Sequence, residues 1–204
     1  MAVNTRNSIV TNGLVLALDA GNTKSYTSGS TNWRDLSGNN YSGSLINGPT
    51  FDNNNGGSIV FDGTNDYIDN IGATSTFSFI QNIGIFTINA WVKLNDLSVA
   101  RYFIGNNDGT TGAKGFYLGY NGTLGRLWLS MTSGVSGQPI LNYISSNNFF
   151  TNNDWIHVVC VGNGTNSQFY KNGVIFGSSS TNFGTLSTGN STQNLSIGRI
   201  NNFN

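Results

Sequence analysis

The chain has 204 residues, of which only 9% are charged, and nine Lys and Arg residues balance nine acidic residues to zero formal net charge. A chain with zero net charge lacks the net positive charge that attracts nucleic acid or an anionic membrane. The single cysteine, Cys160, excludes an internal disulfide and a cysteine zinc cluster, and its strand context predicts a small buried side chain. Every acidic residue is Asp and there are 27 Gly, so turns and strands are favoured over helices.

The length of the chain fits one β domain preceded by a short arm. Residues 1–12 are polar apart from Ile9 and Val10, so we expect an arm without a secretory signal. No apolar stretch approaches the length of a membrane span. Residues 13–204 carry the turn-separated strand patterns of a single domain, and Gly13 to Leu18 is the first predicted strand.

A long, loop-like segment follows, from residue 19 to residue 57. Trp33, Tyr41, Leu45 and Phe51 are expected to fasten it to the body of the domain, with a short strand near residues 42–46. Residues 58–61 and 66–69 then surround the turn sequence DGTN, which predicts a hairpin.

The clearest amphipathic strand runs from Ile85 to Leu94. Polar and apolar residues alternate there, so one face carries Phe86, Ile88, Ala90, Val92 and Leu94, and the other carries Thr87, Asn89, Trp91 and Lys93. The same pattern predicts further strands at residues 101–105, 114–120, 125–131, 140–145 and 194–200.

The stretch from Asp154 to Gly177 organises the rest of the chain. Its first strand has two largely apolar faces, which is typical of a strand in the middle of a sheet and covered on both sides. A second strand pair surrounds Asn172-Gly173, a strong signal for a type I′ hairpin turn. Many short strands at this spacing predict an all-β fold, an antiparallel β-sandwich of the jelly-roll type without a substantial helix.

Several motifs, in their order and spacing, resemble one known superfamily. They are GLVLALDAGN, WRDLSGNN, GGSIVFDGTNDYI, FTINAWVK, the W-x-H-V pattern at Trp155, FYKNGV, and LSIGR ending at Arg199. Together they resemble the laminin-G-like, concanavalin-A-like jelly-roll superfamily. They come closest to the form in virion structural proteins of tailed phages, especially phages of cyanobacteria and other marine bacteria. The superfamily includes lectins, glucanases, adhesion modules and spacers, so the resemblance implies a fold and leaves the function open.

The resemblance also implies one more strand after Arg199, which pairs beside the first strand. We therefore expect residues 13–204 to lack the final strand of the domain. An unpaired strand at residues 13–18 would expose N–H and C=O groups. We expect that edge to be covered by residues 1–12, by another subunit, or by residues outside these 204.

Catalytic chemistry has few candidate residues. His157 is the only histidine and lies in a strand, so a serine triad or a multi-histidine metal site is not expected. Glucanases of the superfamily use paired glutamates, and this chain contains no Glu. Asp62, Asp66 and Asp69 form the densest carboxylate cluster, but Asp beside a Gly-containing turn usually bonds the turn backbone. We expect no enzyme.

A calcium site is the one cofactor hypothesis. Relatives bind Ca²⁺ through loop Asp side chains and carbonyl oxygens, and Asp108, with Asn106 and Asn107, offers oxygen ligands. A single carboxylate binds weakly, so a plain turn without metal is the alternative that we favour.

Two tryptophans lie on polar strand faces. Trp91 shares its face with Asn89, and Trp128 shares its face with Arg126. Aromatic rings stack on sugars while amide and guanidinium groups bond hydroxyls, so these four residues are candidate glycan ligands. The alternative is that this face is a packing surface under the long loop or another subunit.

The leading functional hypothesis is a phage virion structural protein at the surface of a capsid or tail, with adhesion to host glycan as its role. Its expected partners are other virion proteins, copies of itself and a host-surface glycan. A bacterial carbohydrate-binding or adhesin domain is the alternative, and a glycan hydrolase is the third hypothesis.

Overall fold

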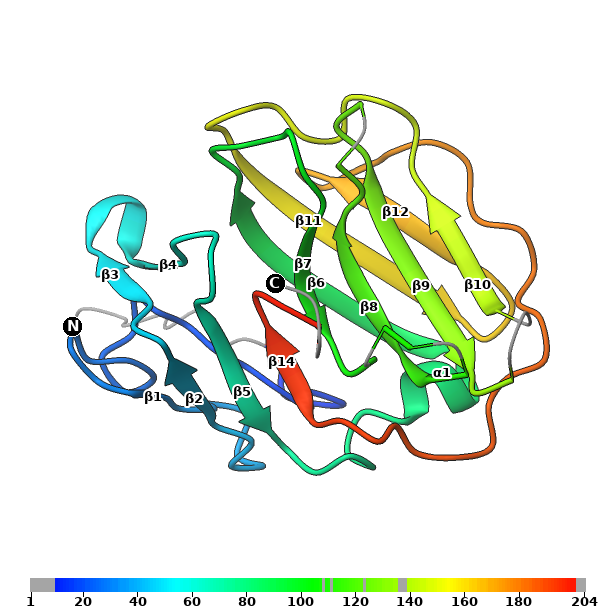
Figure 1. Ribbon diagram of the computed structural model, residues 1–204, viewed down its shortest axis with the longest axis horizontal. Helices are drawn as coiled ribbons and strands as arrows, with labels where there is room; N and C mark the ends of the chain where they lie inside the picture. Colours follow the sequence, from blue (N-terminus) through cyan, green and yellow to red (C-terminus); the bar gives the residue numbers. More distant parts are fainter. Residues whose placement is uncertain (1–9, 108, 111, 123, 136–138, 201–204) are drawn as a thin grey trace, which may run out of the picture.

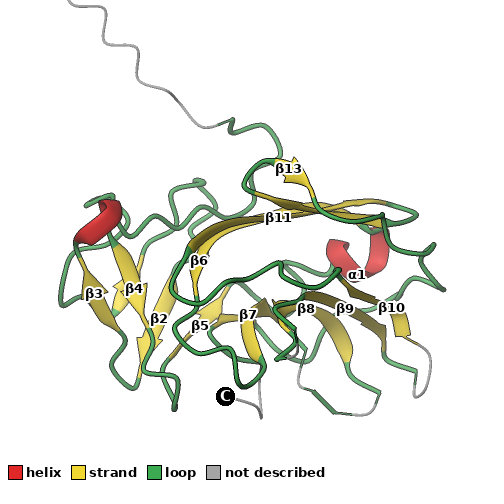
Figure 2. Cartoon of the chain, turned by 90° about the horizontal axis from the view of Figure 1, so that it is seen from above, coloured by secondary structure: helices red, strands yellow, loops and turns green. Residues whose placement is uncertain are grey.

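The computed structural model describes residues 10–107, 109–110, 112–122, 124–135 and 139–200 (Figure 1). In this part of the chain, two antiparallel sheets pack face to face, with one short α-helix at one end of the space between them (Figure 2). This arrangement confirms the predicted β-sandwich of the jelly-roll type.

The larger sheet has eight strands, in the order β1-β2-β5-β14-β7-β8-β9-β10, and every neighbouring pair is antiparallel. Its strands are β1 (Asn32–Trp33), β2 (Gly43–Ile46), β5 (Tyr67–Ile71), β7 (Arg101–Gly105), β8 (Lys114–Tyr120), β9 (Leu127–Ser133), β10 (Pro139–Ile144) and β14 (Leu195–Ile197).

The smaller sheet has four strands, in the order β13-β12-β11-β6. They are β6 (Ile85–Lys93), β11 (Trp155–Asn163), β12 (Ser167–Lys171) and β13 (Val174–Ile175). A separate pair, β3 (Thr50–Asp52) and β4 (Ser58–Val60), encloses a 3₁₀ turn, and helix α1 (Phe79–Ile83) contacts β6, β8 and β9.

One apolar layer between the two sheets forms the core. The small sheet contributes Ile156, Val158 and Cys160, all nearly inaccessible to solvent. The large sheet contributes the alternate residues of its central strands, namely Phe116, Leu118, Tyr120, Leu127, Leu129 and Met131. Burial raises the pKa of the Cys160 thiol, so this side chain is the buried hydrophobe that the sequence predicts.

Several local predictions are confirmed. The strands predicted at residues 101–105 and 114–120 match β7 and β8, and β6 carries its apolar and polar residues on opposite faces. Asn172 and Gly173 both have positive φ, 51° and 82°, and join β12 to β13. These values fit the type I′ turn that the Asn-Gly pair predicts.

Residues 13–18 are not a strand, contrary to the prediction. Side chains of a neighbouring loop take the backbone groups that a strand ladder would use: Ala17 N–H donates to the Asp35 carboxylate, the Ser37 hydroxyl donates to the Val15 carbonyl, and Asn39 Nδ2 donates to the same carbonyl. The loop thus holds this segment against the core without a ladder.

The Asp35 carboxylate is the centre of this attachment. Besides Ala17, it accepts bonds from the N–H and hydroxyl groups of Ser37, at 2.8 and 2.7 Å, and from Tyr41 N–H at 3.0 Å. Burial opposes ionisation of Asp35, but these hydrogen bonds outweigh it and lower the pKa of Asp35 below 3.8.

The hairpin predicted at residues 58–61 and 66–69 is also wrong. β4 pairs with β3, whereas β5 pairs with β2 and β14, so the intervening turn carries the chain from one sheet to another. The Asp62 carboxylate accepts backbone N–H groups of Thr64 and Asn65, and Asp66 accepts the N–H of Asp62. These side-chain bonds replace the ladder that a hairpin would need.

β11 lies inside its sheet, as predicted, but only one of its faces is covered. Its inner residues are buried, while its outward residues, such as His157 and Val159, are half-buried and no layer of the described chain covers them. β6 is an edge strand of this sheet. The N–H of Asn172 donates to the His157 carbonyl toward β12, so Trp91, opposite His157, directs its own N–H and C=O away from β11 toward the open edge.

Replacing Asp35 by Asn should lower the free energy of unfolding at pH 7 by about 1–3 kcal/mol. The Asn side chain is uncharged and has one acceptor oxygen in place of two, so it cannot accept all the hydrogen bonds that the carboxylate accepts. The pKa of Asp35 in the folded chain lies below its ordinary value of 3.8. The stabilisation by the Asp35 carboxylate is therefore fully present above pH 3.8 and is lost as the pH falls through the folded pKa. Urea unfolding at pH 7 and pH 3 measures both effects. Asp52→Asn is the matched control, because Asn54 is the one hydrogen-bond partner of the Asp52 carboxylate among the described residues. Equal losses in the two variants would contradict the central role of Asp35.

Amide hydrogen exchange should alternate along β6. The amides of Ile88 and Ala90 point toward β11 and should exchange slowly, whereas those of Asn89 and Trp91 point to the open edge and should exchange fast. NMR exchange on the isolated chain checks this pattern. Slow exchange at all four amides would show that something covers the edge.

Candidate functional site

The sandwich places the two candidate tryptophans on different sheets. Asn89 and Trp91 lie in β6 of the small sheet, whereas Trp128 lies in β9 of the large sheet and Arg126 lies just before it. The two sheets form separate layers (Figure 2). Because their inner faces pack together, the outward side chains of β6 and β9 point to opposite sides of the molecule. The structure therefore does not bring the four residues together into one face.

Trp91 lies against the only histidine. His157 is its cross-strand neighbour on β11, and the two rings stack with centroids 5.0 Å apart. Trp91 remains 65% exposed, and Asn89 beside it is exposed too. On this sheet face the Trp91 and His157 rings therefore pack against each other.

On the large sheet, three aromatic rings follow one another across β7, β8 and β9. Tyr102 and Tyr117 meet edge to face at 5.3 Å, and Tyr117 and Trp128 meet edge to face at 4.7 Å. The indole N–H of Trp128 donates to the Asn142 side chain on β10. Arg126 Nε donates to Asn147 Oδ1 at 2.9 Å. The rings therefore form a row whose last member is oriented by a hydrogen bond.

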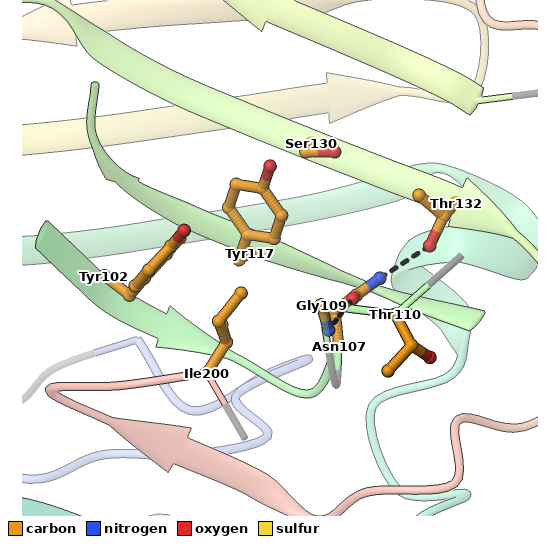
Figure 3. A pocket seen from close by; sticks show the side chains of 8 residues that line it. All are labelled: Tyr102, Asn107, Gly109, Thr110, Tyr117, Ser130, Thr132 and Ile200. Carbon is orange, nitrogen blue, oxygen red and sulfur yellow. Dashed lines mark hydrogen bonds between the residues drawn. The ribbon is translucent and has the colours of Figure 1, made fainter. Parts of the chain in front are cut away.

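A pocket of about 210 Å³ adjoins this row (Figure 3). Asn107 forms one wall: its Nδ2 donates to Thr132 Oγ1 at 2.7 Å, and its Oδ1 accepts Gly109 N–H at 2.7 Å. The Tyr117 hydroxyl lies toward Ser130 in the view of Figure 3. The residues that line the pocket are Tyr102, Asn107, Gly109, Thr110, Tyr117, Ser130, Thr132 and Ile200. The pocket therefore combines apolar rings with hydroxyl and amide groups.

The two tyrosine hydroxyls of this pocket stay protonated. Burial raises the pKa of Tyr117 to about 12, and burial also raises the pKa of Tyr102. At neutral pH both groups are neutral and can donate and accept hydrogen bonds.

Tyr102, Tyr117 and Asn142 were missed by sequence reasoning. Alternation within the strand at residues 114–120 could place Tyr117 opposite the core residues of its own strand. Alternation says nothing about which strands are neighbours, and only the order β7-β8-β9-β10 brings these side chains beside Trp128.

The candidate carboxylates have structural partners. A hydrogen bond from the Thr64 backbone N–H lowers the pKa of Asp62, so this group stays ionised and is unsuited to act as a general acid. Asp69 pairs with Arg199 at 2.7 Å, and the Arg199 guanidinium lies 3.4 Å from the centroid of the Tyr67 ring. These contacts join β5 to the segment that follows β14.

The calcium hypothesis stays untested at its central residue, because Asp108 lies outside the described residues. Asn106 Oδ1 accepts the N–H of Phe116, and both polar atoms of Asn107 are bonded within the protein. Among the described residues, no three His, Cys, Asp or Glu side chains cluster as metal ligands would. The described chain also holds no helix with the length and apolarity of a membrane span.

Several solved structures are similar to this chain. The chain is similar in structure to the IT-sialidase CBM40 of Ruminococcus gnavus bound to α2,3-sialyllactose, with 11% identity, 60% of this chain and 68% of that chain covered, and a TM-score of 0.47. It is also similar to the leech intramolecular trans-sialidase complexed with 2,7-anhydro-Neu5Ac, with 13% identity, 60% of this chain and 19% of that chain covered, and a TM-score of 0.41. A third similar structure is the Caenorhabditis elegans galectin LEC-6, with 15% identity, 58% of this chain and 88% of that chain covered, and a TM-score of 0.27.

A comparison with curated protein sequences finds no match. A family model described as the concanavalin A-like lectin/glucanases superfamily matches residues 62–204, which span β5 to the end of the chain. The chain therefore belongs to the concanavalin A-like lectin/glucanases superfamily.

Proposed function

We propose that this domain binds carbohydrate through the outer face of its large sheet. The observation that carries the proposal is the row of Tyr102, Tyr117 and Trp128 beside a polar pocket. Sugars present C–H faces that stack on aromatic rings and hydroxyls that need donors and acceptors. Membership of a superfamily that contains lectins supports the same assignment.

The geometry suits binding because the rings are already oriented. Trp128 is held by Asn142 and by the edge of Tyr117. Its ring is therefore ordered before a ligand arrives and loses little further freedom on binding. Arg126, two residues before Trp128, adds guanidinium donors at the end of the row. The Trp91 ring is the more exposed of the two, but Trp91 does not line this pocket.

Binding without hydrolysis is the activity that we propose. Retaining and inverting glycosidases need two carboxylates on either side of the bond that breaks. Asp62 and Asp66 bond the turn between β4 and β5, and Asp69 is paired with Arg199. None of these three Asp residues lines the pocket.

Trp128→Ala should weaken glycan binding several-fold, because one stacked ring contributes on the order of 1 kcal/mol. A glycan array identifies a ligand, and calorimetry then compares the variants. Trp91→Ala is the matched control: it removes an exposed tryptophan from the opposite sheet and should leave the affinity unchanged. Melting curves confirm that both variants are folded. Loss of binding in Trp91→Ala alone would move the site to the small sheet.

For the setting of this module we propose the surface of a phage particle, as part of the capsid, fibre or tail. The support is the order of the sequence motifs, which resembles virion structural proteins of tailed phages. Binding of host-surface glycan would then promote adhesion, with other virion proteins or copies of itself as partners. A bacterial carbohydrate-binding or adhesin domain is the alternative setting.

Mass spectrometry of purified particles and antibody labelling in electron micrographs test this setting. We expect the chain in intact particles, with label at their surface. Its absence from particles, together with a secretion signal or surface anchor in its parent protein, would favour a bacterial adhesin.

A further inference from the structure

We infer that the sugar unit bound in the pocket beside Tyr117 is neutral and not acidic. This inference rests on the proposed carbohydrate-binding function and concerns the class of ligand. None of the described residues that line the pocket is charged, and its polar groups are hydroxyls and one amide. The lining therefore matches the hydroxyls of a neutral sugar and offers no counter-ion to a carboxylate.

Two cationic residues next to the pocket in sequence, Arg101 and Arg199, have carboxylate partners. Arg101 precedes Tyr102, and its guanidinium pairs with Asp96 at 3.2 Å. Arg199 precedes Ile200, and its guanidinium pairs with Asp69 and lies over Tyr67. Both cations are thus already matched by a carboxylate.

Arg126 lies two residues before Trp128, at the end of the aromatic row that is away from the pocket. It precedes Ser130, which lines the pocket, by four residues along the same extended chain. At about 3.3 Å per residue, this separation is roughly 13 Å, more than the width of one sugar ring. A carboxylate bonded to Arg126 would therefore lie outside the pocket.

The hydrogen-bond donors in the pocket do not replace a cation. Both Tyr102 and Tyr117 are neutral because burial raises the pKa of each hydroxyl. The amide of Asn107 already bonds Thr132 and Gly109. A carboxylate that left water for such a site would lose strong hydration and gain only neutral partners, which disfavours acidic sugars.

The size and shape of the pocket also point to one small unit. Its volume of about 210 Å³ lies below the roughly 300–1,000 Å³ of pockets for larger ligands. Figure 3 shows the Ile200 side chain beside the rings of Tyr102 and Tyr117, across from the hydroxyl-bearing side chains of Ser130 and Thr132. A neutral sugar, with an apolar side and a hydroxylated side, fits both walls.

Matched saccharide pairs test the inference on the full chain. The probes are N-acetyllactosamine and its α2,3-sialylated form, and glucose and glucuronic acid oligomers on one array. We expect at least ten-fold tighter binding of the neutral member of a pair, with an affinity that changes less than two-fold between 50 and 500 mM NaCl. Equal or tighter binding of the acidic member would overturn the inference and leave carbohydrate binding standing. Failure to bind any saccharide would overturn both.

A designed cation provides the second arm. Thr110 lines the pocket and is exposed, so Thr110→Arg places a guanidinium at its rim without disturbing the core. It should shift the preference several-fold toward the acidic member, whereas the neutral control Thr110→Gln should not. An unchanged preference in Thr110→Arg would mean that the lack of a cation is not what excludes acidic sugars, and would overturn the inference.

Discussion

A single apolar layer between two sheets determines the rest of this structure. Each strand has a side-chain period of two, so burying Val158 and Cys160 on one sheet and Leu127 and Leu129 on the other leaves every second residue to face outward. The chain has few charges with which to cover those outward faces. They therefore carry Trp, Tyr, Asn, Ser and Thr, and the side chains available for binding are those that the core excludes.

Sequence patterns predicted the strands well wherever burial determines their structure. The limits of β8 follow from the period-two recurrence of its buried residues, and the Asn172-Gly173 turn follows from backbone sterics. For the candidate site, alternation predicted correctly that Trp91 and Trp128 point away from the core residues of their own strands. It could not show that the two strands belong to different sheets, because strand order depends on contacts between residues distant in sequence.

The predictions that failed are in segments where side chains bond the backbone. GLVLAL has the composition of a strand, yet Asp35, Ser37 and Asn39 take up its polar groups. The DGTN sequence has the composition of a hairpin turn, yet Asp62 and Asp66 hold it in a form that leads β5 into the large sheet. Strand propensity is a property of one segment and does not include the side chains that reach its backbone from other segments. In both places, short polar side chains bond the backbone groups that a strand would use to pair with a neighbouring strand.

The two outer faces differ in what binding would cost. On the small sheet, Trp91 is exposed and touches His157, so a ligand there would stay largely in water on an open surface. On the large sheet, the Tyr117 ring is fixed between Tyr102 and Trp128, and Trp128 is hydrogen-bonded to Asn142. Because folding has already ordered these rings, less of the interaction free energy is lost in ordering them when a ligand arrives. Their neutral hydroxyls also keep their hydrogen-bonding capacity over the whole physiological pH range. These contacts among outward side chains are the reason that we propose the large sheet as the binding surface, even though its tryptophan is the less exposed of the two.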